Sequence, residues 1–170
     1  MRTITRIFLA STLFLGCVGC DQATKGVARA HLGLGEVHSF LHDTVRLIYV
    51  ENAGAFLSFG ESLPEQIRST LFIVGVGMIS MGALLAALIA RGLGRWHVVA
   101  LSLIASGGFG NWIDRLTNDG RVTDFLNVGA GTLRTGIFNV ADIVLMTGVA
   151  LFFLGSSRWA TSNKSLKRTR

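Results

Sequence analysis

The sequence predicts an all-α polytopic membrane protein with four transmembrane helices, a small exoplasmic β-sheet and a short surface helix. Composition is the first reason, because 50% of the 170 residues are apolar and only 15% are charged, with a mean hydropathy of +0.52. Soluble domains rarely combine these values. The single proline and the lack of low-complexity linkers or repeats leave no domain boundary, so residues 1–170 are predicted to form one membrane domain.

Four apolar stretches are the second reason, because each is long enough to cross a bilayer as a helix. The clearest is the second stretch, which has no charged residue and would measure about 31 Å at about 1.5 Å per residue. The third ends in a run of small residues, which favours close packing between helices. The predicted spans are residues 4–23, 70–90, 96–113 and 137–154.

The distribution of charge is the third reason, and it also predicts the orientation. With a cytoplasmic N-terminus, the cytoplasmic segments carry nine basic residues and no acidic residue, whereas the other side carries seven basic and ten acidic residues. This is the positive-inside pattern, so both termini are predicted to be cytoplasmic. The basic C-terminal tail is then expected to touch anionic lipid and not nucleic acid.

The first span carries polar residues near both ends. Arg6 is expected to snorkel toward the interface, and the apolar run up to Cys17 and Cys20 could also be a cleaved signal peptide, although the three later spans favour a retained helix. The two cysteines are expected to pack as small apolar residues. Asp21 and Lys25 share a helix face, either as an interfacial ion pair or as part of a site.

The loop at 26–69 is too long for a plain connection and is predicted to be exoplasmic. Segments 45–50 and 55–59 resemble short strands, with turn residues at 51–54 between them. Residues 62–65 combine a serine, a proline and an acid in the order that starts a helix. This loop therefore provides the predicted sheet and surface helix.

The third span ends in a polar group of residues. Asn111 and Arg115 are four residues apart, so both side chains can point toward one site at the membrane boundary. Asp114 is better explained as an interfacial anchor, with Trp112 in the aromatic belt beside it.

Asp124 and Asp142 are the strongest candidates for chemistry. Both are set among apolar residues, where an ionised carboxylate is costly unless it has partners and a function. Asn139 precedes Asp142 by three residues and can cap the helix, bind the carboxylate, or do both. Two such carboxylates suggest acid and base chemistry. The alternative is that Asp142 caps a helix and Asp124 ends a strand.

Five short motifs in this order resemble those of the bacterial lipoprotein signal peptidases, also called signal peptidase II. The motifs are Asp21-Gln-x-x-Lys25, Asn52-x-Gly54-Ala-Phe56, Gly110-Asn111-x-x-Asp114-Arg115, Val122-x-Asp124-Phe125 and Phe138-Asn139-Val-Ala-Asp142. Each is weak alone, but their order and the four-span layout make the resemblance specific. Trp112 departs from the expected aliphatic residue, and Ala53-Gly54 varies a familiar turn, so the role of Gly54 is open.

The resemblance implies an aspartic endopeptidase of the bacterial inner membrane that cuts diacylglyceryl-modified prolipoproteins on the N-terminal side of the lipidated cysteine, near the exoplasmic face. It implies Asp124 and Asp142 as the catalytic pair. It implies supporting or substrate-binding roles for Asn52, Gly54, Asn111, Arg115, Asn139, Asp21 and Lys25. The expected partners are lipid-modified signal peptides and membrane lipids, with no cofactor, metal, nucleic acid or obligate protein partner.

Two other classes of function fit parts of the pattern. In a proton or ion conductor, Asp124, Asp142 and Arg115 would form a relay, but the span at 70–90 offers no charged group. In a scaffold protein, the polar residues would act as glue between helices. Either would tolerate Asp→Asn substitutions better than a peptidase.

Overall fold

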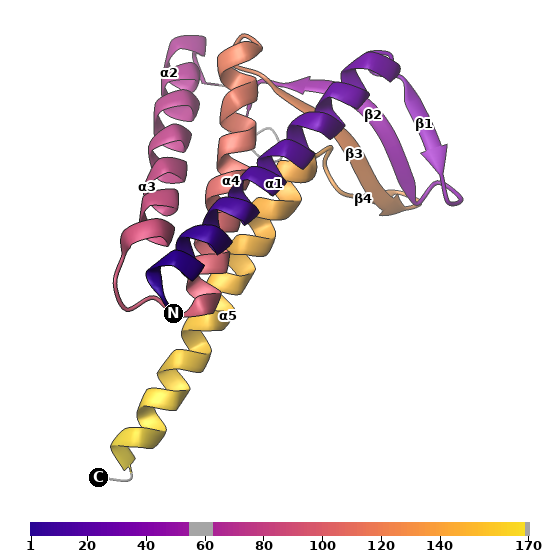
Figure 1. Cartoon of the computed structure of the whole chain (residues 1–170). Helices are drawn as coiled ribbons and strands as arrows, with labels where there is room; N and C mark the ends of the chain where they lie inside the picture. Colours follow the sequence, from indigo (N-terminus) through magenta and orange to yellow (C-terminus); the bar gives the residue numbers. More distant parts are fainter. Residues whose placement is uncertain (55–62, 169–170) are drawn as a thin grey trace.

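A computed structural model describes residues 1–54 and 63–168, with side chains described as far as residue 155. Four helical columns lie side by side, and a small sheet sits at one end of them (Figure 1). The helical segments are α1 (Thr3–His31), α2 (Glu65–Thr70), the π-helical η2 (Leu71–Gly75), α3 (Val76–Ile89), α4 (Arg95–Thr117) and α5 (Val140–Arg168). Helix α4 is central, because it packs on α1, α3 and α5.

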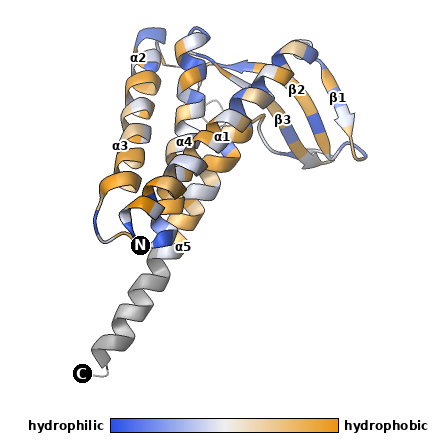
Figure 2. Ribbon diagram, viewed as in Figure 1, coloured by the Kyte–Doolittle hydropathy of each residue, from blue (hydrophilic) through white to orange (hydrophobic). Residues whose placement is uncertain are grey.

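The predicted class, a mostly helical membrane-type fold with a small antiparallel sheet, is confirmed. Among the described residues, Thr3–His31 and the continuous helix Glu65–Ile89 are long and apolar enough to cross a membrane. Figure 2 shows α3 as mainly hydrophobic, with hydrophilic residues at α2. The apolar helix Val140–Gly155 is shorter. Crossing by α4 and α5, and the orientation, stay predictions.

The helices differ from all four predicted spans in their bounds: α4 is Arg95–Thr117 where 96–113 was predicted, and α5 is Val140–Arg168 where 137–154 was predicted. Helix α1 continues to His31, past the predicted end at residue 23, so Asp21 and Lys25 lie inside a helix. The helix predicted to start near 62–65 does begin at Glu65, but it runs through η2 into α3 and does not form a separate surface helix. No proline follows Pro64, so nothing in the sequence forces a break there.

Trp112 faces a neighbouring helix and not an aromatic belt. Its indole nitrogen donates to the carbonyl oxygen of Ile73 at 2.8 Å, within the π-helical turn. A Cβ at Gly77 would lie 2.6 Å from that nitrogen, so glycine is needed for this close approach. The contact explains why an aromatic residue is accommodated at this position of α4.

The sheet is antiparallel, with strand order β1-β2-β3-β4. Its strands are β1 (Val37–Phe40), β2 (Val45–Asn52), β3 (Val122–Ala130) and β4 (Leu133–Arg134). The predicted strand at 45–50 is confirmed as part of β2, whereas the one at 55–59 lies outside the described residues. Strand β3 pairs with β2 so that Asp124 lies opposite Val50 and Val122 opposite Asn52. Asp124 is therefore inside a strand and does not end it.

Arg6 caps the end of α3, and the expectation that it snorkels toward the membrane interface stays a prediction. Its guanidinium donates to the carbonyl oxygens of Ala86, Ala87 and Ala90 at 3.3, 2.7 and 2.6 Å. These carbonyls are in or just beyond the last turn of α3, where the helix leaves acceptors without intrahelical donors and where a positive charge is favourable. Arg6 thus ties the start of α1 to the end of α3.

Replacing Arg6 tests this cap. Arg6→Ala removes three charged hydrogen bonds, so we expect the apparent melting temperature in detergent to fall by on the order of 5 °C. The control is Arg2→Ala, since Arg2 is exposed and its loss should leave the melting temperature unchanged. Equal melting of Arg6→Ala and the parent protein would contradict the capping role.

Candidate active site

Asp124 is a buried carboxylate held by two amide groups. It is the third residue of β3, and its side chain is 2% exposed. Asn52, at the end of the paired strand β2, donates to Asp124 Oδ2 at 2.8 Å. Asn139, just before α5, donates to Oδ1 at 2.6 Å. Each carboxylate oxygen therefore has a neutral donor, and the plane of the group is fixed.

Asp142 lies in the first turn of α5, where it forms a reciprocal cap with Asn139. The backbone N–H of Asp142 donates to Asn139 Oδ1 at 3.0 Å, and the backbone N–H of Asn139 donates to Asp142 Oδ2 at 3.2 Å. This is the capping-box arrangement, with aspartate in the third helical position. Asn139 does both things expected of it, because its side-chain oxygen caps the helix and its backbone N–H binds the Asp142 carboxylate. In addition, its amide nitrogen binds Asp124. The predicted cap at Asp142 and its candidacy for chemistry are thus compatible.

Asn111 of α4 links Asp142 to the interior of the protein. Its amide nitrogen donates to Asp142 Oδ1 at 2.8 Å. Its amide oxygen accepts from Lys25 Nζ at 2.9 Å and from Asn139 Nδ2 at 3.0 Å. A lysine ammonium can only donate, so Lys25 holds the amide oxygen of Asn111 on its own side and turns the N–H₂ group toward Asp142. Lys25 is therefore a positioning residue.

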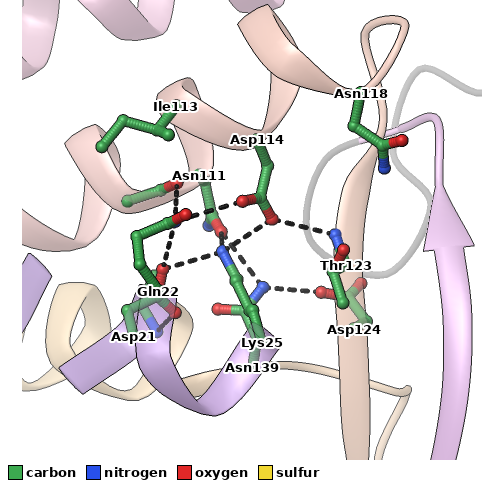
Figure 3. A network of polar contacts seen from close by, with 12 residues as sticks. Asp21, Gln22, Lys25, Asn111, Ile113, Asp114, Asn118, Thr123, Asp124 and Asn139 are labelled. Atoms are coloured by element: carbon green, nitrogen blue, oxygen red, sulfur yellow. Dashed lines mark hydrogen bonds and ion pairs between the residues drawn. The ribbon is translucent and has the colours of Figure 1, made fainter. Parts of the chain in front are cut away.

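Lys25 lies between two buried carboxylates (Figure 3). Its ammonium is 2.9 Å from Asp21 and 3.0 Å from Asp114, and no more than 1% of any of the three side chains is exposed. The i,i+4 ion pair that was one alternative for Asp21 and Lys25 is present, but it is buried inside the protein, and so is Asp114. Asp114 also accepts from the backbone N–H of Thr123 at 3.0 Å, and Asp21 accepts from that of Ala141 at 2.9 Å. The residues that directly precede Asp124 and Asp142 are thus anchored to one cluster.

Gln22 and Gly110 complete this cluster and were not expected as site residues. The Gln22 amide donates to Asp114 at 3.1 Å, to the Gly110 carbonyl oxygen at 3.1 Å and to Asp21 at 3.2 Å. A Cβ at Gly110 would lie 2.6 Å from Asp21 Oδ2, so α4 needs glycine there. Both residues belong to the motifs quoted above, and this position within a motif could have identified them as site residues from the sequence.

Arg115 holds the chain that leaves β2. Its guanidinium donates to the carbonyl oxygen of Gly54 at 2.8 Å and to that of Asn111 at 3.3 Å, and it lies 5.1 Å over the Phe72 ring. Gly54 in turn donates its N–H to Asn52 Oδ1 at 2.9 Å. Among the described residues, no carboxylate lies within ion-pair distance of Arg115. It therefore orients Asn52 through the turn at Gly54.

One small cavity joins the two candidate carboxylates. It measures about 20 Å³, enough for about one water molecule. Its lining residues are Asn52, Gly54, Asn111, Arg115, Val122, Asp124, Ile137 and Asp142. Asn139 lies beside it, and Asp21 and Lys25 lie behind it as supports. In the described part of the chain, no group of three or more His, Cys, Asp or Glu residues could hold a metal ion.

The two carboxylates have different surroundings. Burial raises the pKa of Asp124 from its ordinary value of 3.8 to about 6, the hydrogen bond from Asn52 lowers it, and the charge of Asp142 raises it again. Asp142 is only partly buried. Two carboxylates on one cavity cannot both ionise cheaply, and the burial of Asp124 favours a proton on that carboxyl group.

Three comparisons with known proteins give consistent matches. The family model described as Signal peptidase (SPase) II matches residues 13–158. The "Lipoprotein signal peptidase" of Streptococcus pneumoniae (strain ATCC BAA-255 / R6) is 32% identical over 146 residues, covering 86% of this chain and 90% of the relative. That of Streptococcus pyogenes serotype M2 (strain MGAS10270) is 36% identical over 149 residues, covering 88% and 91%. A solved structure described as a bacterial membrane enzyme has a TM-score of 0.75 at 27% identity, over 94% of this chain and 91% of that chain.

The buried cluster makes a prediction about stability. Lys25→Met leaves Asp21 without a cation and leaves Asp114 with only the half-exposed Arg29 at 4.0 Å, and breaking a buried ion pair in this way costs about 3–5 kcal/mol. We expect the apparent melting temperature to fall by on the order of 10 °C. The triple variant with Asp21→Asn and Asp114→Asn removes the three buried charges together and should recover most of the loss.

The control for this prediction is Arg91→Met, because Arg91 is an exposed basic residue outside the cluster. It should melt like the parent protein. If Lys25→Met also melted at the parent temperature, or if the triple variant were less stable than Lys25→Met, the cluster would not be the anchor described here.

Proposed function

The chain belongs to the signal peptidase II family, and from this we propose that it is an aspartic endopeptidase with Asp124 and Asp142 as its catalytic pair. Membership of the family makes the chain a peptidase that removes signal peptides from prolipoproteins, as the motifs predicted. The finer proposal is that it cuts diacylglyceryl-modified prolipoproteins on the N-terminal side of the lipidated cysteine. The remaining site residues position this pair or the substrate.

One observation carries the proposal. Two carboxylates from different elements, β3 and α5, line the same cavity, and the cavity has room for about one water molecule. Asp124 and Asp142 are each held by amide or backbone N–H donors. Neutral donors orient the carboxylates without supplying a charge that would force both to ionise. This is the environment that acid and base catalysis by a carboxylate pair requires.

The reaction follows with the proton on Asp124 and the negative charge on Asp142. Asp142 takes a proton from water as the water oxygen bonds to the scissile carbonyl carbon, and Asp124 gives its proton to the carbonyl oxygen. The proton on Asp142 then passes to the leaving nitrogen as the C–N bond breaks, and Asp124 regains a proton from a hydroxyl of the intermediate. The pair ends as it began, with one proton and one negative charge.

The location of the site fits a substrate that arrives from the bilayer. We place the protein in the bacterial inner membrane as one domain with four spans and cytoplasmic termini, on the charge pattern above. The residues that line the cavity include members of β2, β3, α4 and α5. These elements meet where the helices adjoin the sheet (Figure 1), which would be the exoplasmic side. Large apolar residues such as Phe8, Ile79 and Phe153 are exposed on the helices, as expected for contact with lipid. A lipidated signal peptide could then reach the site laterally.

The conductor and scaffold alternatives have no comparable support. Among the described residues, the buried charged side chains are Asp21, Lys25, Asp114, Arg115 and Asp124. Figure 3 shows residues of α1, α4 and β3 that meet in this one cluster. A conductor needs polar groups through the full membrane depth, and α3 carries no charged residue. The chain also belongs to a family of peptidases.

Asparagine substitutions in the pair test the proposal. Asp124→Asn and Asp142→Asn keep the size of the side chain but remove ionisation, so each should lower the cleavage rate of a purified, lipidated prolipoprotein by on the order of 10³-fold or more. The double variant should be scarcely slower than either single variant, because the two groups act as a unit. Release of the signal peptide is followed on a gel.

The matched control is Asp119→Asn. Asp119 is exposed, and its positive φ of 47° suits asparagine as well as aspartate, so cleavage should continue at the parent rate. A folded Asp124→Asn or Asp142→Asn protein that cleaved at nearly the parent rate would refute the aspartic mechanism.

A further inference from the structure

Strand β2 carries one residue more than a regular pairing with β3 allows. Leu47 pairs with Leu126, and the pairing resumes with Val50 opposite Asp124, so β2 advances three residues where β3 advances two. This is a β-bulge, and the extra residue reverses the side-chain faces of the positions that follow it in the strand. Because the bulge lies just before Asn52, it decides which residue of β2 faces the candidate carboxylates.

The bulge places a neutral amide beside Asp124 and keeps a carboxylate away from it. Paired residues share a face of the sheet, and the face alternates along each strand. In a regular register Tyr49 would pair with Asp124, and Glu51 would share its face. In the bulged register Asn52 donates to Asp124 at 2.8 Å, while Glu51 pairs with Thr123 on the opposite face. A slip of one residue would therefore bring a further negative charge to the site.

We propose that Glu51 is a positioning residue that holds this register from the opposite face of the sheet, so that Asn52 reaches Asp124. The sequence predicted 51–54 as a turn, whereas Glu51 and Asn52 are the last two residues of β2. The inference rests on the proposed function and adds to it a residue that acts on the candidate pair through the pairing of two strands.

Glu51 joins three separate parts of the chain. Its carboxylate accepts hydrogen bonds from the Tyr49 hydroxyl of β2, from the Asn118 amide after the end of α4, and from Thr123 Oγ1 of β3 at 3.4 Å. Burial and the hydrogen bond to Glu51 raise the pKa of Tyr49 to about 12, so the hydroxyl keeps its proton at neutral pH. A slipped β2 would lose the bonds from Asn118 and Thr123, because both belong to other elements.

Thr123 connects Glu51 to the buried cluster behind the site. Its side chain is fully buried, and its hydroxyl also accepts from the Arg29 guanidinium at 3.0 Å. Its backbone N–H donates to Asp114 at 3.0 Å, and it directly precedes Asp124 in β3. Glu51 is not among the residues that line the small cavity. It therefore supports Asp124 and Asn52 through their strands and not by contact with substrate.

A double-mutant cycle on cleavage of a lipidated prolipoprotein tests the inference. Glu51→Ala should lower kcat by about 10- to 100-fold, the effect of misplacing a group in a preorganised site. The double variant Glu51→Ala with Asn52→Ala should be scarcely slower than Asn52→Ala alone, because Glu51 acts through Asn52. Single effects that multiplied in the double variant would show that Glu51 acts independently of Asn52, and this would overturn the inference.

Two conservative variants separate position from charge, and they serve even if Glu51→Ala does not fold. Glu51→Gln keeps the length and the hydrogen-bonding groups of the side chain, and the Asn118 amide can turn to match it, so the rate should stay near that of the parent protein. Glu51→Asp keeps the charge but shortens the reach, so it should slow cleavage. The reverse order of these two rates would mean that the charge matters and not the position, which would overturn the inference.

The pH profile gives a readout that a general loss of stability would not move. The hydrogen bond from Asn52 lowers the pKa of Asp124, so Glu51→Ala should raise that pKa and shift the alkaline limb to higher pH. The other charged groups that act on Asp124 are Asp142, Lys25 and Arg115, and the substitution leaves them in place. A shift to lower pH would be the effect of removing a nearby negative charge, and it would contradict the positioning role.

Glu36→Ala is the matched control, because Glu36 is an exposed glutamate just before β1 and its loss should change neither the rate nor the pH profile. Melting in detergent identifies the variants that are folded. A folded Glu51→Ala protein that cleaved at the parent rate would overturn this inference alone, whereas no cleavage by the unmodified protein would overturn the proposed function with it.

Discussion

The buried ammonium of Lys25 is the interaction on which the rest of the site depends. It lies between Asp21 and Asp114 at 2.9 and 3.0 Å, and both carboxylates are buried, so removing the ammonium would be costly. Those carboxylates then bind the backbone N–H groups of Ala141 and Thr123, one residue before Asp142 and Asp124. A buried ion pair is weak evidence for stability, but here it sets the position of a helix start relative to a strand. The gain is geometrical, because one cation helps to fix the positions of both candidate carboxylates.

A second layer of neutral amides lies between this cluster and the carboxylates. Asn52, Asn111 and Asn139 supply the side-chain donors, and Asn139 binds both sides of the site. Had charged donors taken these places, both carboxylates would ionise and no acid would remain. Arg115 is instead held by carbonyl oxygens at Gly54 and Asn111. The two candidate carboxylates are thus hydrogen-bonded by neutral amides, with the ammonium of Lys25 behind them, while Arg115 lines the cavity between them.

Part of the fold and of the candidate site could be predicted from the sequence. Local contacts were predictable, whereas contacts between residues far apart in the sequence were not, and this has physical causes. Asn139 and Asp142 are three residues apart, so their cap follows from local helix geometry. The pairing of β3 with β2 joins residues about seventy apart, such as Asn52 and Val122, and no local pattern reports such a contact. Asp114 looked like an interfacial anchor because its partners come from α1 and β3. The cavity also required coordinates, since it depends on how α5 packs beside the sheet.

The pH dependence of kcat/KM for a lipidated precursor tests the central claim, that the pair works with one proton, most directly. Burial raises the pKa of Asp124 to about 6, so activity should fall as the pH rises through that region and the acid is lost. It should fall again toward low pH, when the base becomes protonated, and the two limbs belong to the pair as a whole. A bell-shaped profile with its alkaline limb near pH 6 is the expected result. A rate that stayed constant from acid to alkaline pH in the folded protein would contradict the account.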